Sequence, residues 1–330
     1  MRVVVAGTAF GRIYLEAVRD DLAGILAQGS DYSKACADRY GVPLYTSVDD
    51  VPDVDVACVV VKSGALGGPG TDLARAFLKR GIHVLQEHPV HADEIASLLR
   101  EARGGVSYAV NTLYPNLRPV RQFLAAAEVI RKHQRIEFID AACNSQVLYP
   151  LIDILGRVAG GLRPWEFGEP FDGRPFQSLH AVIGGVPVTL RVQNQVHPGD
   201  PDNHSYFLHR ISVGCEGGVL TLADTHGPVL WNPRLHSPRD ETGRLIMDAA
   251  RLDVPNIEVV GSPVTYLDVF ADLWPDAVAE SLRAMHDPAG RQWALSVSTV
   301  WRDLTARIGL PELINPGEPK PLDLLKELAC

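Results

Sequence analysis

Two short stretches of this 330-residue chain carry side chains that could donate a proton. His88 and His91 follow the apolar run Ile82 to Leu85, and Tyr114 follows the apolar run Val106 to Val110. Imidazole and phenol groups can both act as general acids when the reacting atom lies within hydrogen-bond distance. The pattern therefore indicates candidate proton donors placed directly after two segments that are typical of strands.

The chain between these donors predicts one helix, from about Ala92 to Ala102, and one strand. Because the carboxyl ends of parallel strands meet at one edge of a sheet, where open α/β sheets bind ligands, we expect His88 and Tyr114 at the same edge. Plainer interpretations stay open for each. Histidine is often only partly buried, so His88 could simply be held at a helix entrance by Pro89. Tyr114 could be an aromatic that packs a domain boundary, and His91 could contact substrate or point to solvent.

The elements that must position these residues alternate between β-branched runs and amphipathic stretches, a pattern that predicts βαβ units and a parallel sheet. The expected strands are Val3 to Ala6, Leu22 to Ala27, Val56 to Val61, Ile82 to Leu85 and Val106 to Val110, and the expected helices are Arg12 to Asp20, Ser33 to Tyr40, Thr71 to Arg80 and Ala92 to Ala102. Tyr114-Pro115-Asn116 ends this part, since proline disfavours helix in the residue before it. Residues 1–115 are predicted to form a doubly wound Rossmann domain.

Residues 116–330 show a different pattern and are predicted to form a second, α+β domain. Helices are expected at Pro119 to Lys132, Val147 to Val158, Tyr266 to Met285 and Arg291 to Ile308, and strands at Ile136 to Ala142, Phe176 to Ile183, Val186 to Val196, Tyr206 to Val213, Gly218 to Ala223 and Val229 to Trp231. Successive strands joined by glycine-containing turns favour a largely antiparallel sheet. Trp231 to Pro263 is expected to be a loop. An exposed face of this sheet could pair with a second copy, so a homodimer is expected.

The first strand is followed at once by Gly7-Thr8-Ala9-Phe10-Gly11 and then by a predicted helix. In this setting backbone N–H groups and the helix dipole can hold a pyrophosphate. The full G-x-G-x-x-G pattern is absent, because Ala9 stands near the place of the second glycine. These five residues are candidate cofactor contacts, and a tight turn without a ligand is the alternative.

The end of the second strand lacks the acidic residue that binds the ribose 2′-hydroxyl in NAD-binding proteins, since neither Gln28 nor Ser30 is acidic. Ser30, Ser33 and Lys34 could hold a 2′-phosphate instead, although Asp31 is an unfavourable neighbour. This favours NADP as the cofactor. Both serines could equally cap the following helix.

A second glycine-rich stretch, from Lys62 to Gly70, follows the strand that ends at Val61. It lies at the predicted ligand-binding edge of the sheet. Lys62, Ser63 and Gly68 are therefore candidate cofactor contacts, and a flexible connector is the alternative.

Composition excludes several classes of function. The formal charge is −9, which is unfavourable for binding a phosphate backbone, so no nucleic acid is expected. Apolar runs are too short for a signal peptide or a membrane span, and a cytoplasmic protein is expected. Five cysteines occur singly, which predicts neither a disulfide framework nor a zinc knuckle. His197, His204 and His209 with Asp200 and Asp202 lack convincing ligand spacing, so no metal site is predicted and the segment is interpreted as a loop that could border the substrate.

Glu87-His88-Pro89 resembles the E-K-P motif of the glucose-fructose oxidoreductase and inositol dehydrogenase superfamily, with histidine in place of lysine. Within it, four stretches together resemble the thiazolinyl imine reductases of yersiniabactin and pyochelin biosynthesis: Gly7-Thr8-Ala9-Phe10-Gly11, Gly67-Gly68-Pro69-Gly70, Gln86-Glu87-His88-Pro89-Val90-His91 and Asn111-Thr112-Leu113-Tyr114-Pro115. The resemblance is strongest over residues 1–120.

This resemblance implies NADPH-dependent reduction of a thiazoline C=N bond to a thiazolidine while the substrate is tethered to a nonribosomal peptide synthetase. It places the candidate general acids on His88 and Tyr114, adds Glu87 to the cofactor contacts, and sets His91 and Asn111 beside the substrate. It also implies an open approach between the domains for the tethered chain. Two alternatives stay open: a sugar or cyclitol dehydrogenase, against which the missing E-K-P lysine argues, and a non-catalytic NADP-sensing protein.

Overall fold

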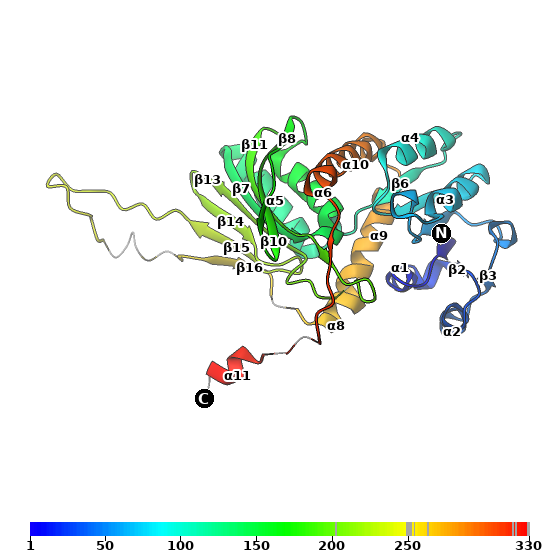
Figure 1. The fold of residues 1–330 in the computed structure, drawn as a ribbon. Coiled ribbons are helices and arrows are strands. Elements are labelled where there is room, and N and C mark those ends of the chain that lie inside the picture. Colours follow the sequence, from blue (N-terminus) through cyan, green and yellow to red (C-terminus); the bar gives the residue numbers. More distant parts are fainter. Residues whose placement is uncertain are drawn as a thin grey trace.

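The computed structural model describes residues 1–201, 203–248, 253, 255–262, 264–318, 320 and 322–328. Two sheets organise these residues, a parallel sheet in the N-terminal part and a larger mixed sheet in the C-terminal part (Figure 1). The predicted fold class, a Rossmann domain followed by an α+β domain with a largely antiparallel sheet, is confirmed.

The N-terminal sheet has the strand order β3-β2-β1-β4-β5-β6, and every pairing in it is parallel. Its strands are β1 (Val3–Ala6), β2 (Leu22–Leu26), β3 (Leu44–Tyr45), β4 (Val56–Val59), β5 (His83–Glu87) and β6 (Tyr108–Asn111), and its helices are α1 (Gly11–Ala17), α2 (Asp31–Tyr40), α3 (Gly70–Lys79) and α4 (Ala92–Glu101). All residues of β1 and β4 are buried because helices cover both faces of the sheet. The strand order reverses between β1 and β4, and this is the point where open α/β sheets bind ligands.

The C-terminal sheet has the order β16-β15-β14-β13-β7-β11-β10-β8, with β9 paired to β10. Its strands are β7 (Ile136–Asn144), β8 (Trp165–Phe167), β9 (Phe171–Gly173), β10 (Phe176–Ile183), β11 (Val186–Gln193), β13 (His209–Cys215), β14 (Gly218–Leu222), β15 (Val229–Pro233) and β16 (Glu258–Val260), while β12 (Gln195–Val196) pairs with β17 (Glu312–Leu313). Among the strand pairings of this sheet that the described residues form, the β7–β11 pair alone is parallel.

Most predicted boundaries shift by a few residues, and two differences in the C-terminal sheet have a visible cause. β13 begins at His209 rather than Tyr206, because the Tyr206 N–H donates to the side chain of Gln193 and not to a neighbouring strand. The predicted loop from Trp231 to Pro263 contains part of β15 and all of β16, which pairs antiparallel with β15 at the sheet edge.

Helices α5 (Arg118–His133) and α6 (Leu148–Ala159) cover one face of the C-terminal sheet. The opposite face has no helix on it in the described part of the chain, and its side chains, such as Asp140, Arg191 and Arg210, are exposed. The last long helices, α9 (Trp274–Ala284) and α10 (Ala289–Ile308), return to the N-terminal sheet and pack against α1, α4 and β6. The site edge of the N-terminal sheet is therefore covered by residues from the end of the chain.

After β15, residues 235–248 form an arm that extends away from both sheets (Figure 1). Its tip is a hydrogen-bonded turn in which the Asp240 carboxylate accepts from the N–H groups of Thr242 and Arg244. The bonds found for the described residues 237–246 stay within the arm. Leu235 and Met247 are 86% and 70% exposed, so the arm gains little burial from its own chain.

Candidate active site

His88 lies directly after β5 and is held at one ring nitrogen by two acceptors. Its Nδ1 is 2.8 Å from Glu87 Oε1 and 3.0 Å from the backbone oxygen of Asn111. A carboxylate and a carbonyl can only accept, so the proton sits on Nδ1. Nε2 is then the nitrogen that can exchange a proton with a bound molecule.

The His88 ring is also enclosed by aromatic side chains. Tyr149 on α6 stacks on it, with ring centroids 5.7 Å apart and an interplanar angle of 25°. Tyr114 lies edge-on at 6.2 Å. The His88 and Glu87 side chains are 8% and 11% exposed, so the Glu87–His88 contact is shielded from water.

Tyr114 follows β6 at the same edge of the sheet, as the sequence predicts. Its ring meets His209 edge-on at 4.9 Å and Trp274 at 6.4 Å, and the residue is 5% exposed. The two candidate proton donors are thus brought together with aromatic groups from both domains, although Tyr114 also packs the domain boundary as the plainer interpretation expects.

His209 belongs to the surroundings of Tyr114 rather than to a histidine-rich loop. Its Nε2 lies 2.9 Å from the Val147 oxygen and its Nδ1 lies 3.0 Å from the Thr225 hydroxyl. Complete burial lowers the pKa of His209 to about 4, so the ring is neutral near pH 7. Because the Val147 carbonyl can only accept, Nε2 carries the proton.

A network of buried, hydrogen-bonded side chains connects Glu87 to three other elements of the fold. Tyr14 on α1 donates its hydroxyl proton to Glu87 Oε2, and the Asn111 amide donates to the Tyr14 oxygen at 2.5 Å. Asn111 Oδ1 accepts from the N–H of Leu113 and from the Ser281 hydroxyl on α9, both at 2.8 Å. Burial, reinforced by the Glu87 charge, holds the pKa of Tyr14 well above its usual value, so its hydroxyl keeps its proton. Asn111 is thus fixed within the protein, next to the proton donors.

The turn from Gly7 to Gly11 has the geometry of an anion-binding loop. Gly7 has φ of +102°, and a Cβ there would lie 2.4 Å from the Val60 oxygen, so glycine is required. No acceptor within the described residues takes a hydrogen bond from the N–H of Thr8, Ala9 or Phe10. These donors stand at the start of α1, beside the point where strand order reverses.

The second glycine-rich stretch is an ordered loop rather than a flexible connector. The Glu94 carboxylate accepts from the N–H of Gly64 at 3.0 Å and from the Thr71 hydroxyl at 2.6 Å. The Ser63 hydroxyl donates to the Pro89 oxygen at 2.6 Å, and a Cβ on Gly68 would lie 2.2 Å from the Lys62 oxygen. The loop is therefore fixed against the segment that carries His88, and Glu94, which sequence reasoning missed, organises it.

The candidate 2′-phosphate contacts divide into one exposed and one buried serine. Ser30 is exposed and caps α2, where its oxygen accepts from the Ser33 N–H. Ser33 is buried, and its hydroxyl donates to the Ser30 backbone oxygen at 2.8 Å. Lys34 is exposed and pairs with Asp31 at 3.3 Å. Ser30 thus caps α2, and the buried Ser33 hydroxyl bonds back to the same residue, while only Ser30 and Lys34 are exposed to a ligand.

His91 is the N-cap of α4 and forms a capping box with Glu94. Its side chain accepts from the Asp93 N–H, so its observed contacts are those of a helix cap.

The loop histidines do not form one cluster. The ring of His197 stacks on that of His204 at 5.2 Å, and His204 lies 3.5 Å from Asp200, whereas His209 is buried elsewhere. Asp202 lies outside the described residues. Within the described part of the chain, no group of three metal-ligating side chains is found and the cysteines are free.

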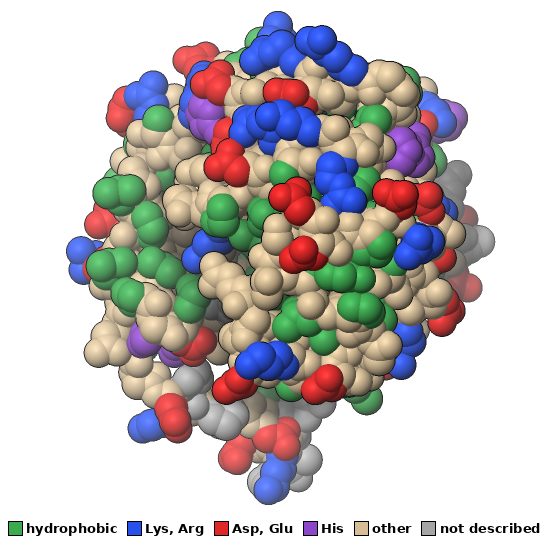
Figure 2. All heavy atoms as spheres, turned by 90° about the vertical axis from the view of Figure 1, so that its right-hand side faces the viewer, with side chains coloured by type: hydrophobic (Ala, Val, Ile, Leu, Met, Phe, Trp, Pro, Cys, Tyr) green, Lys and Arg blue, Asp and Glu red, His purple; other side chains and the backbone are tan. Residues whose placement is uncertain are grey.

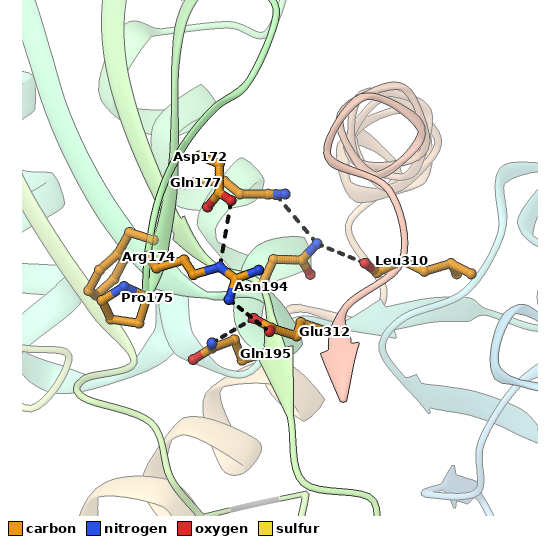
Figure 3. A pocket seen from close by; sticks show the side chains of 9 residues that line it. Asp172, Arg174, Pro175, Gln177, Asn194, Gln195, Leu310 and Glu312 are labelled. Carbon is orange, nitrogen blue, oxygen red and sulfur yellow. Dashed lines mark hydrogen bonds and ion pairs between the residues drawn. The ribbon is translucent and has the colours of Figure 1, made fainter. Parts of the chain in front are cut away.

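A surface pocket of about 210 Å³ lies at the end of β9 and β10, away from His88 and Tyr114 (Figure 3). Its polar side chains are largely engaged with one another: Arg174 pairs with Glu312 at 3.7 Å, and Gln195 donates to the same carboxylate at 2.9 Å. The Asn194 amide donates to backbone oxygens at the end of α10. These contacts join α10 to the sheet and supply no proton donor for a reaction.

The face at the right of Figure 1 carries interspersed acidic and basic side chains, and neither sign forms a continuous field on it (Figure 2). Among the described helices, none has the length and apolar character needed to span a bilayer.

Several residues of the site were not predicted from the sequence. Tyr14 lies between Ile13 and Leu15 in the sequence, so the pattern predicts an aromatic residue of the core. Ser281, Trp274 and His209 come from distant segments, and only their contacts in the fold connect them to the site.

Comparisons with known proteins agree with this architecture. Residues 1–111 match the family model "Oxidoreductase family, NAD-binding Rossmann fold", and residues 134–232 match "Thiazolinyl imine reductase Irp3-like, C-terminal". The N-terminal domain is thus similar to this oxidoreductase family, and the second domain is similar to the C-terminal part of Irp3-like thiazolinyl imine reductases. A search of curated protein sequences finds no match.

Solved structures show the same two-domain fold. A dehydrogenase from Chromobacterium violaceum has 13% identity and a TM-score of 0.67, with 93% of this chain and 94% of that chain covered. UDP-N-acetylglucosamine 3-dehydrogenase GnnA from Acidithiobacillus ferrooxidans has 14% identity and a TM-score of 0.67, with 94% and 97% covered. The 3-ketoreductase KijD10 from Actinomadura kijaniata, in complex with NADP and TDP-benzene, has 16% identity and a TM-score of 0.66, with 96% and 99% covered. At these identities the likeness concerns the fold.

Proposed function

We propose that this protein reduces the C=N bond of a thiazoline to a thiazolidine with NADPH, on an intermediate tethered to a carrier protein of a nonribosomal peptide synthetase. The observation that carries the proposal is the pairing of His88 and Tyr114 at the ligand-binding edge of a Rossmann sheet. The match of the second domain to the Irp3-like family supports the substrate class.

The residues at this edge fit a dinucleotide. The N–H groups of Thr8, Ala9 and Phe10 offer donors to a pyrophosphate, and Gly7 allows close approach of the backbone. Ser30 and Lys34 offer a hydroxyl and a cation to a 2′-phosphate, which favours NADPH over NADH. When bound, the reduced nicotinamide supplies the hydride that adds to the imine carbon.

The protein's own part in this chemistry is to deliver a proton to the imine nitrogen, where negative charge develops. His88 can do so from Nε2, because Nδ1 is held by Glu87 and by the Asn111 carbonyl. The Glu87 carboxylate stabilises the imidazolium form that must exist before the transfer. Burial of the pair strengthens this interaction.

Tyr114 is the second candidate donor and forms part of the wall beside His88. The neutral ring of His209 and the indole of Trp274 fix its position. Either phenol or imidazolium could provide the proton, and the other group would then orient the substrate nitrogen by a hydrogen bond.

A second candidate function is oxidation or reduction at a sugar carbon, because the solved structures of the same fold include a UDP-sugar dehydrogenase and a 3-ketoreductase. The residue after Glu87 argues against it. The resembling superfamily has a lysine there that assists alcohol oxidation, whereas this chain has His88.

The experiment that separates these functions follows NADPH consumption with a hydroxyphenyl-thiazoline carboxylate and, in parallel, with keto-sugar nucleotides. Turnover of the thiazoline alone supports the proposal. Turnover of the sugar alone supports the second candidate, and tight NADPH binding without any turnover favours a sensor.

We further propose that two copies associate through the C-terminal domain. The arm exposes Leu235 and Met247 beyond its own sheet, and the open sheet face carries Arg191 and Arg210 in one row and Asp140 in the next. A twofold axis through this face would bring the basic row of one copy toward the acidic row of the other and would cover both arms.

A further inference from the structure

We propose that Tyr14 is a positioning residue for proton delivery: its hydroxyl fixes the Glu87 carboxylate so that Glu87 keeps His88 in the Nδ1–H form. This inference rests on the proposed role of His88. It concerns a residue on α1, the helix that begins at the candidate pyrophosphate loop.

The two oxygens of the Glu87 carboxylate face different partners. Oε1 faces His88 Nδ1 at 2.8 Å, and Oε2 accepts the proton of Tyr14 and, over a longer distance of 3.5 Å, a hydrogen bond from the Asn111 amide. The last torsion of a glutamate side chain is soft, so the carboxylate plane has no strong intrinsic orientation. With Tyr14 bound to one oxygen, the carboxylate is oriented and the other oxygen stays on the imidazole.

Tyr14 can hold this position because it is itself fixed. It is completely buried, and its oxygen accepts from the Asn111 amide at 2.5 Å while its proton goes to Glu87. The Asn111 side chain is held in turn by Leu113 and Ser281. The carboxylate orientation is therefore set by contacts from α1, β6 and α9 together.

The tautomer of His88 follows from this arrangement. The Asn111 backbone oxygen lies 3.0 Å from Nδ1 and contributes, but it is neutral, whereas Glu87 supplies a charged acceptor at 2.8 Å. If the carboxylate turned away, the Nε2–H form of the neutral ring would become competitive, and the ring would lose its charged acceptor at Nδ1. At metal sites, removing a group that orients a histidine costs about 10- to 100-fold in affinity or activity, and we expect an effect of similar size here.

The chain offers a matched control in Tyr108. This tyrosine is also buried and donates to a side chain, the Gln86 oxygen at 2.8 Å, one residue before Glu87. It has no hydrogen bond to Glu87 or His88 among the described residues. Tyr14→Phe and Tyr108→Phe therefore each remove one buried hydroxyl group that donates to a side chain of β5, and only the first contacts the Glu87 carboxylate.

The first test needs no substrate. ¹⁵N spectra of histidine-labelled protein, with the His88 signals assigned by His88→Gln, report which ring nitrogen carries the proton. We expect Nδ1–H in the native protein and in Tyr108→Phe, and a clear gain of Nε2–H in Tyr14→Phe. An unchanged His88 spectrum in a folded Tyr14→Phe, or the same change in Tyr108→Phe, would overturn the proposal.

The second test is a double-mutant cycle on turnover of the thiazoline by the full chain. Tyr14→Phe is expected to lower kcat about 10- to 100-fold, with the NADPH KM within about twofold of native. In a Glu87→Gln background, Tyr14→Phe should lower kcat by less than about twofold, because both substitutions interrupt the same series of hydrogen bonds. Losses that multiply contradict the proposal. A native protein that reduces no thiazoline refutes the proposed function, whereas the tautomer measurement still decides the role of Tyr14.

Discussion

The candidate active site and the arm between β15 and β16 differ in how far their side chains are buried and hydrogen-bonded within the chain. In the site, Tyr14, Glu87 and Asn111 are buried or nearly so, and each is hydrogen-bonded to another member of the group. In the arm, the described residues 237–246 bond within the arm, and apolar Leu235 and Met247 face outward. The side chains of the candidate site therefore find their partners within one chain, whereas Leu235 and Met247 stay exposed, and we propose that a second copy covers them.

The largest effect is expected from substitutions of the two candidate proton donors in the active site. His88→Ala and Tyr114→Phe should each lower kcat for thiazoline reduction, by about 10²- to 10⁴-fold for the residue that donates the proton. NADPH binding should change little, because neither side chain belongs to the candidate dinucleotide loops. Steady-state kinetics with parallel NADPH titrations measure both quantities.

The controls for these variants are His180→Gln, on the exposed side of β10, and Tyr108→Phe. Both should retain kcat within about twofold, as surface and remote changes usually do. Native-like kcat in both His88→Ala and Tyr114→Phe would contradict the proposal that these residues donate the proton.

A second effect concerns the stability of the same region and its dependence on pH. The pKa of His209 is lowered from 6.5 to about 4 in the folded protein by burial. Between these values the unfolded chain binds a proton that the folded chain excludes, so stability is complete above pH 6.5 and is lost as pH falls toward 4. This group contributes a loss of roughly 3 kcal/mol across that window.

Urea unfolding at several pH values measures this loss. His209→Phe should flatten the dependence between pH 6.5 and 4, while His180→Gln should leave it as in the native protein. An equally steep dependence in His209→Phe would show that other groups cause it.

A smaller effect is expected at the rim of the site, where Ser30 is exposed. Ser30→Asp places a carboxylate where a 2′-phosphate is proposed to bind, and charge repulsion should lower the preference for NADPH over NADH about tenfold or more. Ser33→Ala serves as the control, because its hydroxyl is buried in the helix cap. The ratio of kcat/KM for the two cofactors measures the preference, and an unchanged ratio in Ser30→Asp would argue against NADPH specificity at this position.

The smallest effect on kcat is expected from changes in the arm. Replacing residues 235–256 by a short Gly-Ser linker should leave kcat within about twofold, since the bonds of the described residues 237–246 stay within the arm, but should halve the molecular mass in solution if the arm joins two copies. Light scattering with size-exclusion chromatography measures the mass. A native chain that is monomeric at micromolar concentration would contradict the assembly proposal.

The sequence predicted those parts of this molecule that leave a local pattern. The strands Val3–Ala6 and Phe176–Ile183 have the predicted bounds, because buried or alternating β-branched residues define them. The meeting of His88 and Tyr114 also followed from the pattern, since parallel strands end at one edge.

Long-range contacts left no such signal. Ser281 bonds to Asn111 across 170 positions, and Leu113 adopts φ of +56°, a conformation unusual for leucine, where the Asn111 side chain accepts its N–H. The network around Glu87 depends on these contacts, so it could be found only in the fold. The grouping of His209 with His197 and His204 was misleading for the same reason, since neighbours in sequence separated in space.

The central claim is that a hydride and a proton are added across a thiazoline C=N bond, and isotope transfer tests it most directly. Native protein would be incubated with 4-deuterated NADPH and a carrier-tethered hydroxyphenyl-thiazoline, and the product examined by mass spectrometry and NMR. The account predicts a thiazolidine with deuterium on the former imine carbon and a solvent-derived proton on nitrogen. An unchanged thiazoline, under conditions in which NADPH binds, would contradict it.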